Sequence, residues 1–185
     1  MRCMDEKLKA RIKGLIGDEA EVIEGDFERE LYSSDMGEVP FAKRFLHTTP
    51  ELVIQPKKVE VIRKIVQLAI EERVAIFLRG SASSGLGGVV PTVKGIVLDL
   101  TFFNKIVELN MEKETIKVQA GIRWSEIENF LKTKNFSVRT YPSSFFSTVG
   151  GWIATGGYGI GSFRFGHLKD QIESIEVMLP TGEIK

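Results

Sequence analysis

Short apolar segments and one amphipathic stretch follow each other from residue 50 onward. Residues 52–54 form an apolar run that Pro56 ends, and residues 74–78 form a second run that Arg79 and Gly80 close. Between them the chain carries apolar side chains at helical spacing, namely Val59, Ile62, Val66 and Ala69. This order predicts a parallel βαβ unit with a right-handed crossover. A third apolar strand is expected over residues 95–100.

The segment before residue 50 has a different pattern. Asp5 is a candidate N-cap for a helix that Gly17 ends, with an apolar face made of Leu8, Ile12, Leu15 and Ile16. Residues 21–49 are mixed and rich in turn formers. We expect them to form an irregular lead-in arm.

After residue 100 the pattern becomes that of a mixed structure. Two short strands are predicted over residues 106–110 and 115–120, joined as a hairpin. Ser125 and Glu128 have the spacing of a capping box for a helix that presents Ile127, Phe130 and Leu131. A last strand is expected over residues 172–179, turned by Pro180-Thr181-Gly182.

Composition narrows the class of protein. The chain has 185 residues, of which 43% are hydrophobic and 27% charged, which is enough for a folded core. Lys plus Arg and Asp plus Glu are 25 each, so the net charge is zero, which argues against a nucleic-acid partner. A single cysteine, Cys3, excludes an internal disulfide, and with two histidines we expect no metal site. No apolar run approaches the ~20 residues of a transmembrane segment, and the N-terminus does not resemble a signal peptide.

The distribution of glycine points to two segments as candidate functional sites. Four glycines fall within residues 80–88 and seven within residues 150–166, out of 18 in all. The first segment, rich in glycine and serine, leaves the carboxyl end of a predicted buried strand, where open α/β sheets bind ligands. Its backbone N–H groups could form a pyrophosphate nest; a flexible turn that binds nothing is the alternative. The second segment interleaves glycine with Trp, Tyr and Phe, which favours a backbone brought against a flat ligand.

Common nucleotide and hydrolase motifs are absent from both segments. There is no Gly-Lys pair of a Walker P-loop, and the G-x-G-x-x-G pattern fails because Ser162 follows Gly157 and Gly159 where a third glycine is needed. The G-x-S-x-G elbow also fails around Ser83. If a nucleotide binds here, it does not bind in the Rossmann manner.

Several sequence pieces occur together in the order of one known family. They are Tyr32-Ser33-Ser34-Asp35, residues 50–56, Arg79-Gly80-Ser81-Ala82-Ser83-Ser84, residues 96–100 with Asn104, residues 118–121, Thr148-Val149-Gly150-Gly151 with Ala154 and Gly157, and residues 165–170 and 175–180. Through them the chain resembles the PCMH-type FAD-binding domain of the vanillyl-alcohol oxidase family. The closest branch is that of the flavin-binding polypeptide of glycolate oxidase and the FAD-dependent D-lactate dehydrogenases. The resemblance extends over nearly the whole chain.

The resemblance implies a fold and a division into domains. The fold class is α+β, a two-lobed PCMH-type FAD-binding domain with a small parallel βαβ lobe and a mixed or antiparallel lobe. Residues 1–47 would be an N-terminal helix and lead-in arm, and residues 48–185 the FAD-binding domain. Within it, residues 48–104 would form the first lobe and residues 105–185 the second, truncated at its C-terminus relative to the family.

The resemblance also implies a set of residues that contact FAD. Family members that attach flavin through the first loop do so with a His, which residues 80–84 lack, so FAD would be held noncovalently. The first loop would bind the pyrophosphate, the segment from residue 148 would contact the isoalloxazine ring, and Ile175 would lie near adenine. Ser81 and Ala82 stand where the family usually has glycine. The full set is Arg79, Gly80, Ser81, Ala82, Ser83, Ser84, Gly87, Pro142, Thr148, Val149, Gly150, Gly151, Ala154, Gly157, Asp170 and Ile175.

No catalytic residue is identified. In the family, a substrate domain with catalytic His and Arg groups follows the FAD domain, and we expect this chain to lack it. His47 is expected to be solvated or to cap an element, His167 to pack or to lie on the adenine side, and Cys3 to be inert. Oxidation of a 2-hydroxy acid needs a base and a cation for the carboxylate, which a cap domain would supply.

The expected function is therefore that of an FAD-binding domain or subunit of an oxidoreductase for glycolate or D-lactate. The alternatives are a non-catalytic flavin-binding or assembly subunit that needs a partner chain, and a gene fragment. The lead-in at residues 32–35 favours the hydroxy-acid branch over a peptidoglycan-precursor reductase or an ether-lipid synthase. A cytoplasmic location is expected, or one at the membrane periphery through a partner.

Overall fold

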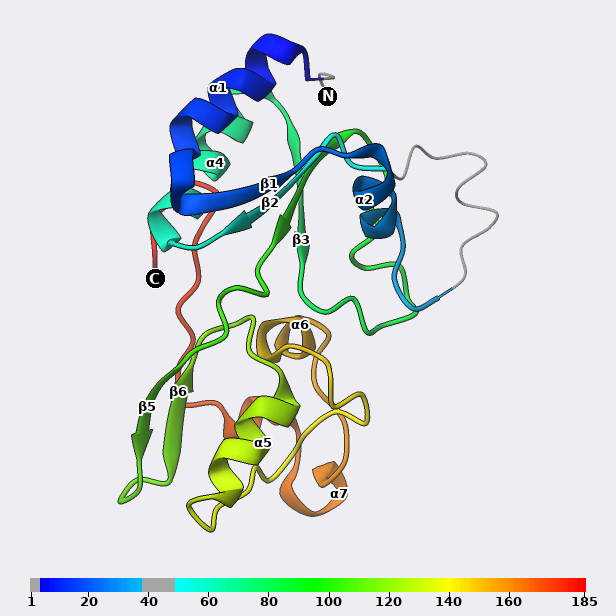
Figure 1. Cartoon of the computed structure of the whole chain (residues 1–185). Helices are drawn as coiled ribbons and strands as arrows, with labels where there is room; N and C mark the ends of the chain where they lie inside the picture. The colour runs from blue at the N-terminus through cyan, green and yellow to red at the C-terminus, as the bar shows by residue number, and fades with distance from the viewer. Residues whose placement is uncertain (1–3, 38–48) are drawn as a thin grey trace. The chain divides into compact units, whose positions relative to one another are not determined.

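The computed structural model describes residues 4–37 and 49–185 and shows an α+β fold (Figure 1). The chain divides into two compact units, one made of the residues up to Asp99 together with Glu176–Lys185, the other of Leu100–Ile175. The elements, with η for 3₁₀ helices, are α1 (Glu6–Ile16), η1 (Gly17–Glu19), β1 (Ala20–Ile23), α2 (Asp26–Glu30), η2 (Leu31–Ser33), β2 (Leu52–Pro56), α4 (Val59–Glu72), β3 (Ala75–Arg79), β4 (Gly95–Asp99), β5 (Ile106–Asn110), β6 (Thr115–Val118), α5 (Trp124–Lys132), α6 (Val149–Ala154), α7 (Ser162–Phe165) and η3 (Leu168–Gln171).

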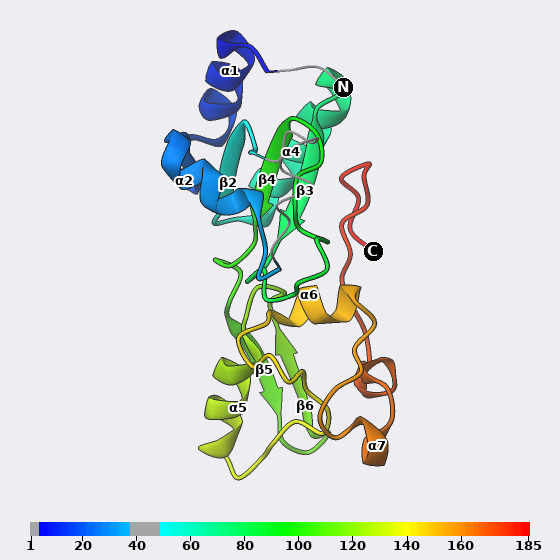
Figure 2. The same cartoon turned by 90° about the vertical axis from the view of Figure 1, so that its right-hand side faces the viewer.

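The first unit is built on a four-stranded sheet with the order β1-β2-β4-β3. Strands β2 and β3 both run parallel to β4, which lies between them, as Figure 2 shows. The predicted parallel βαβ unit and third strand are thus confirmed. Because the three parallel strands end at the same edge, residues 55, 79 and 99 are brought to neighbouring positions there.

One face of this sheet carries the main core of the first unit. Helices α1 and α4 contribute side chains that pack with those of β2 and β4 in one buried cluster. In α4 the buried residues are Val61, Ile65, Leu68 and Ala69, so the predicted face was only partly right: Ile62 is half-buried at its margin, whereas Ala69 is buried. Both sets of positions have helical spacing. The side chains that pack on the sheet are the row with Val61, Ile65 and Leu68, which fills the space above it.

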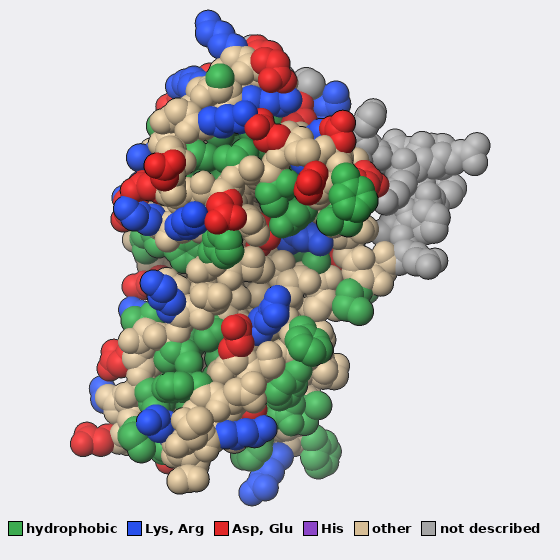
Figure 3. Space-filling model, in the orientation of Figure 1, with side chains coloured by type: hydrophobic (Ala, Val, Ile, Leu, Met, Phe, Trp, Pro, Cys, Tyr) green, Lys and Arg blue, Asp and Glu red, His purple; other side chains and the backbone are tan. Residues whose placement is uncertain are grey.

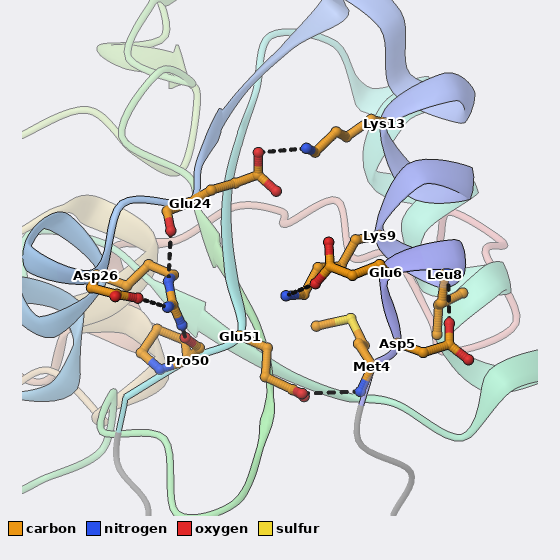
Figure 4. A network of polar contacts seen from close by, with 11 residues as sticks. Met4, Asp5, Glu6, Leu8, Lys9, Lys13, Glu24, Asp26, Pro50 and Glu51 are labelled. Carbon is orange, nitrogen blue, oxygen red and sulfur yellow. Dashed lines mark hydrogen bonds and ion pairs between the residues drawn. The ribbon is translucent and has the colours of Figure 1, made fainter.

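Helix α1 begins and ends as predicted. The Asp5 carboxylate accepts the Leu8 N–H at 2.8 Å, and Gly17 ends the helix with φ +50°. The helix is joined to the rest of the unit by polar contacts that Figure 4 shows: the Met4 N–H donates to Glu51 at 2.9 Å, and Lys13 pairs with Glu24 at 2.5 Å.

The lead-in arm contains more structure than predicted. Residues 20–23 form strand β1, which pairs antiparallel with β2, and α2 and η2 follow it. The prediction of an irregular arm was wrong there because Val22 and Ala20 complete the apolar face beside Ile54 and Pro56, a long-range pairing that a four-residue pattern does not reveal.

The second unit contains the predicted hairpin, β5 paired with β6, and a second core. This core gathers side chains of α5, α6 and the segments around them, including Trp124 and Trp152, whose rings meet edge to face at 5.2 Å. Ile127 and Leu131 of α5 are buried as predicted, and Phe130 packs at the edge of the core.

Two predictions in this half of the chain were wrong. Helix α5 is capped at Arg123, whose N–H donates to Glu126 at 2.9 Å, so Ser125 and Glu128 do not form a capping box. Glu128 is instead buried and accepts from Ser137 and from the Val138 N–H. Residues 172–179 do not form a strand either.

Residues 177–185 form a short hairpin turn that belongs to the first unit. Val177 and Lys185 exchange two backbone hydrogen bonds, of 2.8 and 3.0 Å, across the predicted turn at residues 180–182. The hairpin is tied to α4, because the Arg63 Nε donates to the Gly182 carbonyl at 3.0 Å.

Some expectations fall outside what the structure covers. Cys3 and His47 lie outside the described residues. Within the described ranges, no helix is both long and apolar enough to cross a membrane. On the face drawn in Figure 3, Lys and Arg side chains are interspersed with Asp and Glu.

Candidate functional site

A buried polar cluster lies at the carboxyl edge of the parallel strands. Asp99, at the end of β4, is 5% exposed and accepts hydrogen bonds from the Tyr32 hydroxyl at 3.1 Å and from Gln55 Nε2 at 2.9 Å. Arg79, at the end of β3, is the register partner of Asp99. Charged and polar groups thus gather where ligands bind in open α/β sheets.

The environment of this cluster shifts two ionisation equilibria. Burial, and then the charge and hydrogen bond of Asp99, raise the pKa of Tyr32 to about 12. Burial lowers the pKa of Arg79, opposed by the nearby Asp99, Tyr32 and Asp35. Arg79 stays a cation at neutral pH because an arginine is effectively always protonated in proteins, so one fixed positive charge stands directly before the glycine-rich loop.

The loop of residues 80–88 leaves the sheet directly after Arg79. Ala82 has φ +51°, a left-handed conformation that a side chain makes unfavourable and that glycine adopts freely. The resemblance had placed a family glycine at this position, and the backbone there has kept a conformation that suits glycine. The substitution therefore adds strain to the loop without converting it to an ordinary turn.

Three successive backbone N–H groups of this loop have no acceptor among the described residues. Within the part of the chain that the structure describes, the N–H groups of Ser81, Ala82 and Ser83 make no hydrogen bond. These residues are half-buried. Successive N–H donors without an acceptor, after an arginine, form the kind of site that binds an anion such as a phosphate group.

The loop is held from the other side by the lead-in arm. The Asp35 carboxylate accepts the Gly87 N–H at 2.8 Å, and the Met36 N–H donates to the carbonyls of Ala82 and Ser84 at 3.3 and 3.2 Å. Gly37 lies so close to the loop that a Cβ there would be 2.6 Å from the Gly85 carbonyl oxygen. Sequence reasoning missed these contacts. It used residues 32–35 only as part of the resemblance.

In the second unit, the segment around helix α6 is held against the turn between β6 and α5. The Thr148 side chain caps α6 by accepting the Gly151 N–H at 3.3 Å, and Val149 is buried. The Gly150 N–H donates to the Ala120 carbonyl at 2.8 Å, and a Cβ at Gly150 would be 2.9 Å from that of Ala120. Ala154 ends the helix and is exposed.

Most glycines of the second segment are required by packing within the unit. A Cβ would lie 2.2 Å from the Tyr141 carbonyl oxygen at Gly159, and 2.1 Å from that of Arg139 at Gly161. At Gly157, which has φ +49°, it would meet the Leu168 side chain at 2.6 Å. The interpretation that such glycine density serves a ligand was therefore too strong, because chain crossings account for much of it.

The remaining predicted contacts lie in the same unit as α6. Pro142 is buried and Ile175 is 54% exposed. The Asp170 carboxylate accepts the His167 N–H at 3.1 Å at the start of η3. His167 packs edge-on against the Tyr158 ring at 4.6 Å between centroids, in line with the expected packing role.

The predicted residues thus form two groups. Arg79, Gly80, Ser81, Ala82, Ser83, Ser84 and Gly87 share one loop of the first unit, and Pro142, Thr148, Val149, Gly150, Gly151, Ala154, Gly157, Asp170 and Ile175 belong to the second. The first group shows donors suited to an anion. The second offers an exposed Gly151, beside which a Cβ would meet only the Thr148 hydroxyl.

Comparison with known proteins gives consistent results. Residues 50–185 match the family model of an FAD binding domain. Glycolate oxidase subunit GlcD of Bacillus subtilis is 33% identical over 136 residues, which cover 73% of this chain and 29% of that protein. Alkyldihydroxyacetonephosphate synthase of Dictyostelium discoideum is 31% identical over 140 residues, 74% of this chain and 23% of that protein.

A solved structure extends the comparison to nearly the whole chain. An alkyldihydroxyacetonephosphate synthase superposes with a TM-score of 0.83 at 25% identity, covering 97% of this chain and 34% of that one. The chain spans less than a third of the length of the two curated relatives above. The fold, the donors of the first loop and the family match agree: the chain belongs to the family of PCMH-type FAD binding domains, and its cofactor is FAD.

Proposed function

We propose that the loop of residues 80–84 holds the pyrophosphate of FAD in this protein, without a covalent bond. The observation that carries the proposal is the run of backbone N–H groups at Ser81, Ala82 and Ser83 that have no acceptor in the described structure. Arg79 adds the positive charge, and Gly80, Ser84 and Gly87 complete the loop. No histidine stands in the loop to form a covalent link to flavin.

We further propose that the segment from Pro142 to Ile175 contacts the rest of the cofactor. Thr148, Val149, Gly150, Gly151, Ala154 and Gly157 belong to the segment that would lie against the ring, while Asp170 and Ile175 belong to the elements that would reach the adenine side. The exposure of Gly151 and Ala154 supports this assignment. We also propose that the FAD-binding domain begins at residue 48 and that its second lobe begins at residue 105.

The activity we propose is oxidation of a small 2-hydroxy acid, of the glycolate or D-lactate type. Bound FAD supplies the acceptor for two electrons. The residues of this chain bind and orient it, and the base and the cation for the substrate carboxylate would come from another domain or a partner chain. Similarity to glycolate oxidase subunit GlcD supports the substrate class, and the similar identity to an alkyldihydroxyacetonephosphate synthase makes that substrate the competing choice.

Binding is tested by titrating the purified chain with FAD and with ADP and following flavin fluorescence or heat. Ser81→Glu places a negative charge among the loop donors and should weaken both ligands at least about tenfold. Ala10→Glu, which adds the same charge at an exposed position of α1 outside the proposed contacts, is the control and should bind as the wild type does. Equal affinity of the two variants would refute the pyrophosphate site.

The ring position needs a separate variant. A tryptophan at Gly151 would displace the Thr148 cap, since even a Cβ lies 2.9 Å from its hydroxyl. Ala154→Trp instead places a bulky side chain at the exposed C-terminal end of the same short helix, α6. It should weaken FAD and leave ADP unchanged, with Ala10→Trp on α1 as the control. Loss of ADP binding as well would contradict this placement of the ring.

The substrate class is tested on the FAD-loaded chain without oxygen. We expect D-lactate or glycolate to bleach the flavin band slowly with the chain alone and faster when a substrate-binding domain or partner chain is supplied. Bleaching by neither acid in that complete system would refute the 2-hydroxy-acid proposal.

A second candidate is a non-catalytic flavin-binding or assembly subunit. The observation that favours it is a group of exposed apolar side chains in residues 158–163, with Tyr158 73%, Ile160 49% and Phe163 fully exposed. Retention of flavin only in a complex with a second polypeptide, without substrate oxidation by that complex, would support it.

A further inference from the structure

Asp35 joins the lead-in arm to the glycine-rich loop across 52 residues of sequence. One carboxylate oxygen accepts the Gly87 N–H at 2.8 Å, and the other accepts the Gly37 N–H, also at 2.8 Å. The Asp35 side chain therefore links the backbone of the lead-in arm at Gly37 to the backbone of the glycine-rich loop at Gly87. It is half-buried.

The arm that carries Asp35 is itself fixed to the end of the sheet. Arg79 Nη1 donates to the Ser34 carbonyl at 2.9 Å and to the Tyr32 carbonyl at 3.4 Å, and its guanidinium stacks on the Tyr32 ring at 5.0 Å. The Tyr32 hydroxyl reaches the buried Asp99. Asp35 thus contacts the loop from an arm that hydrogen bonds to Arg79 and Asp99 hold at the end of the sheet.

The contacts also leave the proposed binding groups unengaged. Met36 donates to the carbonyls of Ala82 and Ser84, while the N–H groups of residues 81–83 find no acceptor among the described residues. The arm therefore donates to carbonyl groups of the loop, and the N–H donors of residues 81–83 stay available to a ligand. A preorganised set of donors binds an anion more tightly than one that must be ordered on binding.

We propose that Asp35 is a positioning residue for the phosphate-binding loop, which holds Gly87 so that the donors of residues 81–83 face a pyrophosphate ligand. This inference rests on the proposed function of the loop. The opposing effect is repulsion between the Asp35 carboxylate and the phosphates. Both oxygens of Asp35 already accept N–H donors, and the nearby Arg79 cation offsets the charge, so positioning should outweigh repulsion.

Asp35→Ala, Asp35→Asn and Gly37→Val test the proposal by separate routes. The alanine removes both accepted hydrogen bonds and should weaken ADP and FAD about tenfold, whereas the asparagine keeps one acceptor and should restore part of the affinity. The valine leaves Asp35 in place and pushes the arm from Gly85 by steric clash, so it should weaken both ligands too. Asp18→Ala, an exposed aspartate of the same unit, is the control.

Hydrogen exchange of the ligand-free chain supplies a readout independent of binding. Asp35→Ala should speed exchange of the Gly87 amide, which loses its acceptor, and of the Met36 amide, which donates to the loop, while exchange in β2 and β4 stays as in the wild type. Exchange that rises throughout the sheet would mean a general loss of stability and would overturn a positioning role.

The ligand titrations separate the two proposals. Wild-type chain that binds neither ADP nor FAD would overturn the proposed function, and this inference with it. Wild-type binding that Asp35→Ala leaves unchanged would overturn the inference alone. Tighter binding by Asp35→Ala and Asp35→Asn, with a weaker dependence on salt, would show that repulsion dominates and would also overturn it.

Discussion

Ala82→Gly is a sharp test of the loop conformation, because the residue has φ +51° without being glycine. An L side chain in this region costs roughly 1–2 kcal/mol. Glycine removes that cost but adds roughly 0.5–1 kcal/mol of chain entropy lost on folding. The difference is a stabilisation of about 0.5 kcal/mol, opposite in sign to the usual effect of replacing alanine by glycine.

The magnitude is best judged against a matched variant. Ala10→Gly lies in the exposed middle of helix α1, where the same exchange should destabilise by about 1 kcal/mol. Both tryptophans belong to the second unit, so urea denaturation followed by far-UV circular dichroism reports better on α1 and α4 than tryptophan fluorescence does.

The ligand side of the same variant is also defined. Ala82→Gly keeps the backbone N–H, so its affinity for ADP should stay within about twofold of the wild type. Ala82→Val, β-branched at a positive φ, should lower both the stability and the affinity. Destabilisation by Ala82→Gly as large as that by Ala10→Gly would refute the left-handed conformation and the description of the loop built on it.

Three further results are expected. The pKa of the Tyr32 phenol is raised from 10.0 to about 12, so its contribution to stability is complete below pH 10 and is lost as the pH rises toward 12. Phenolate absorbance, with Tyr32→Phe as the reference, checks this titration. Asp99→Asn should lower the midpoint only partly, because burial is the larger cause of the shift. Gly121→Ala, whose Cβ would lie 1.9 Å from a backbone carbonyl oxygen, should destabilise by about 3 kcal/mol. Gly14→Ala, in the last turn of α1 with nothing within 4 Å, should stabilise by up to about 1 kcal/mol. Thermal melts that rank the two variants the other way would contradict the packing described. Thr148→Ala should cost about 1 kcal/mol by removing the N-cap of α6, and an unchanged urea midpoint would show that the cap is unimportant.

The parallel sheet was predictable from sequence because its strands are continuous apolar runs with a helix between them. Val53 and Val97 are fully buried, so their strands are continuous apolar runs that predict strand without an alternating pattern. Strand β1 was not predictable, since its four residues gain their stability from pairing with β2. The false strand at residues 172–179 has the opposite cause: an apolar run without a partner strand forms only an isolated bridge, Met178 with Ile184.

The candidate site was predictable to the level of segments but not of contacts. Glycine and serine after a strand located the first loop, and the family resemblance assigned it a ligand. The role of Asp35 could not be read from sequence, because nothing local relates it to a glycine 52 positions later. The glycines at 157, 159 and 161 suggested ligand contacts, but they lie where the chain packs closely on itself. Close chain packing and close ligand contact both require glycine, so sequence alone does not separate them.

The central claim is that the loop after Arg79 binds the pyrophosphate of FAD through its backbone donors. Calorimetric titration of the wild-type chain and of Ser81→Glu with FAD and with ADP tests it most directly. We predict that the wild type binds both ligands and that Ser81→Glu weakens both at least about tenfold. A wild-type chain that binds FAD with an affinity unaffected by Ser81→Glu would contradict the claim.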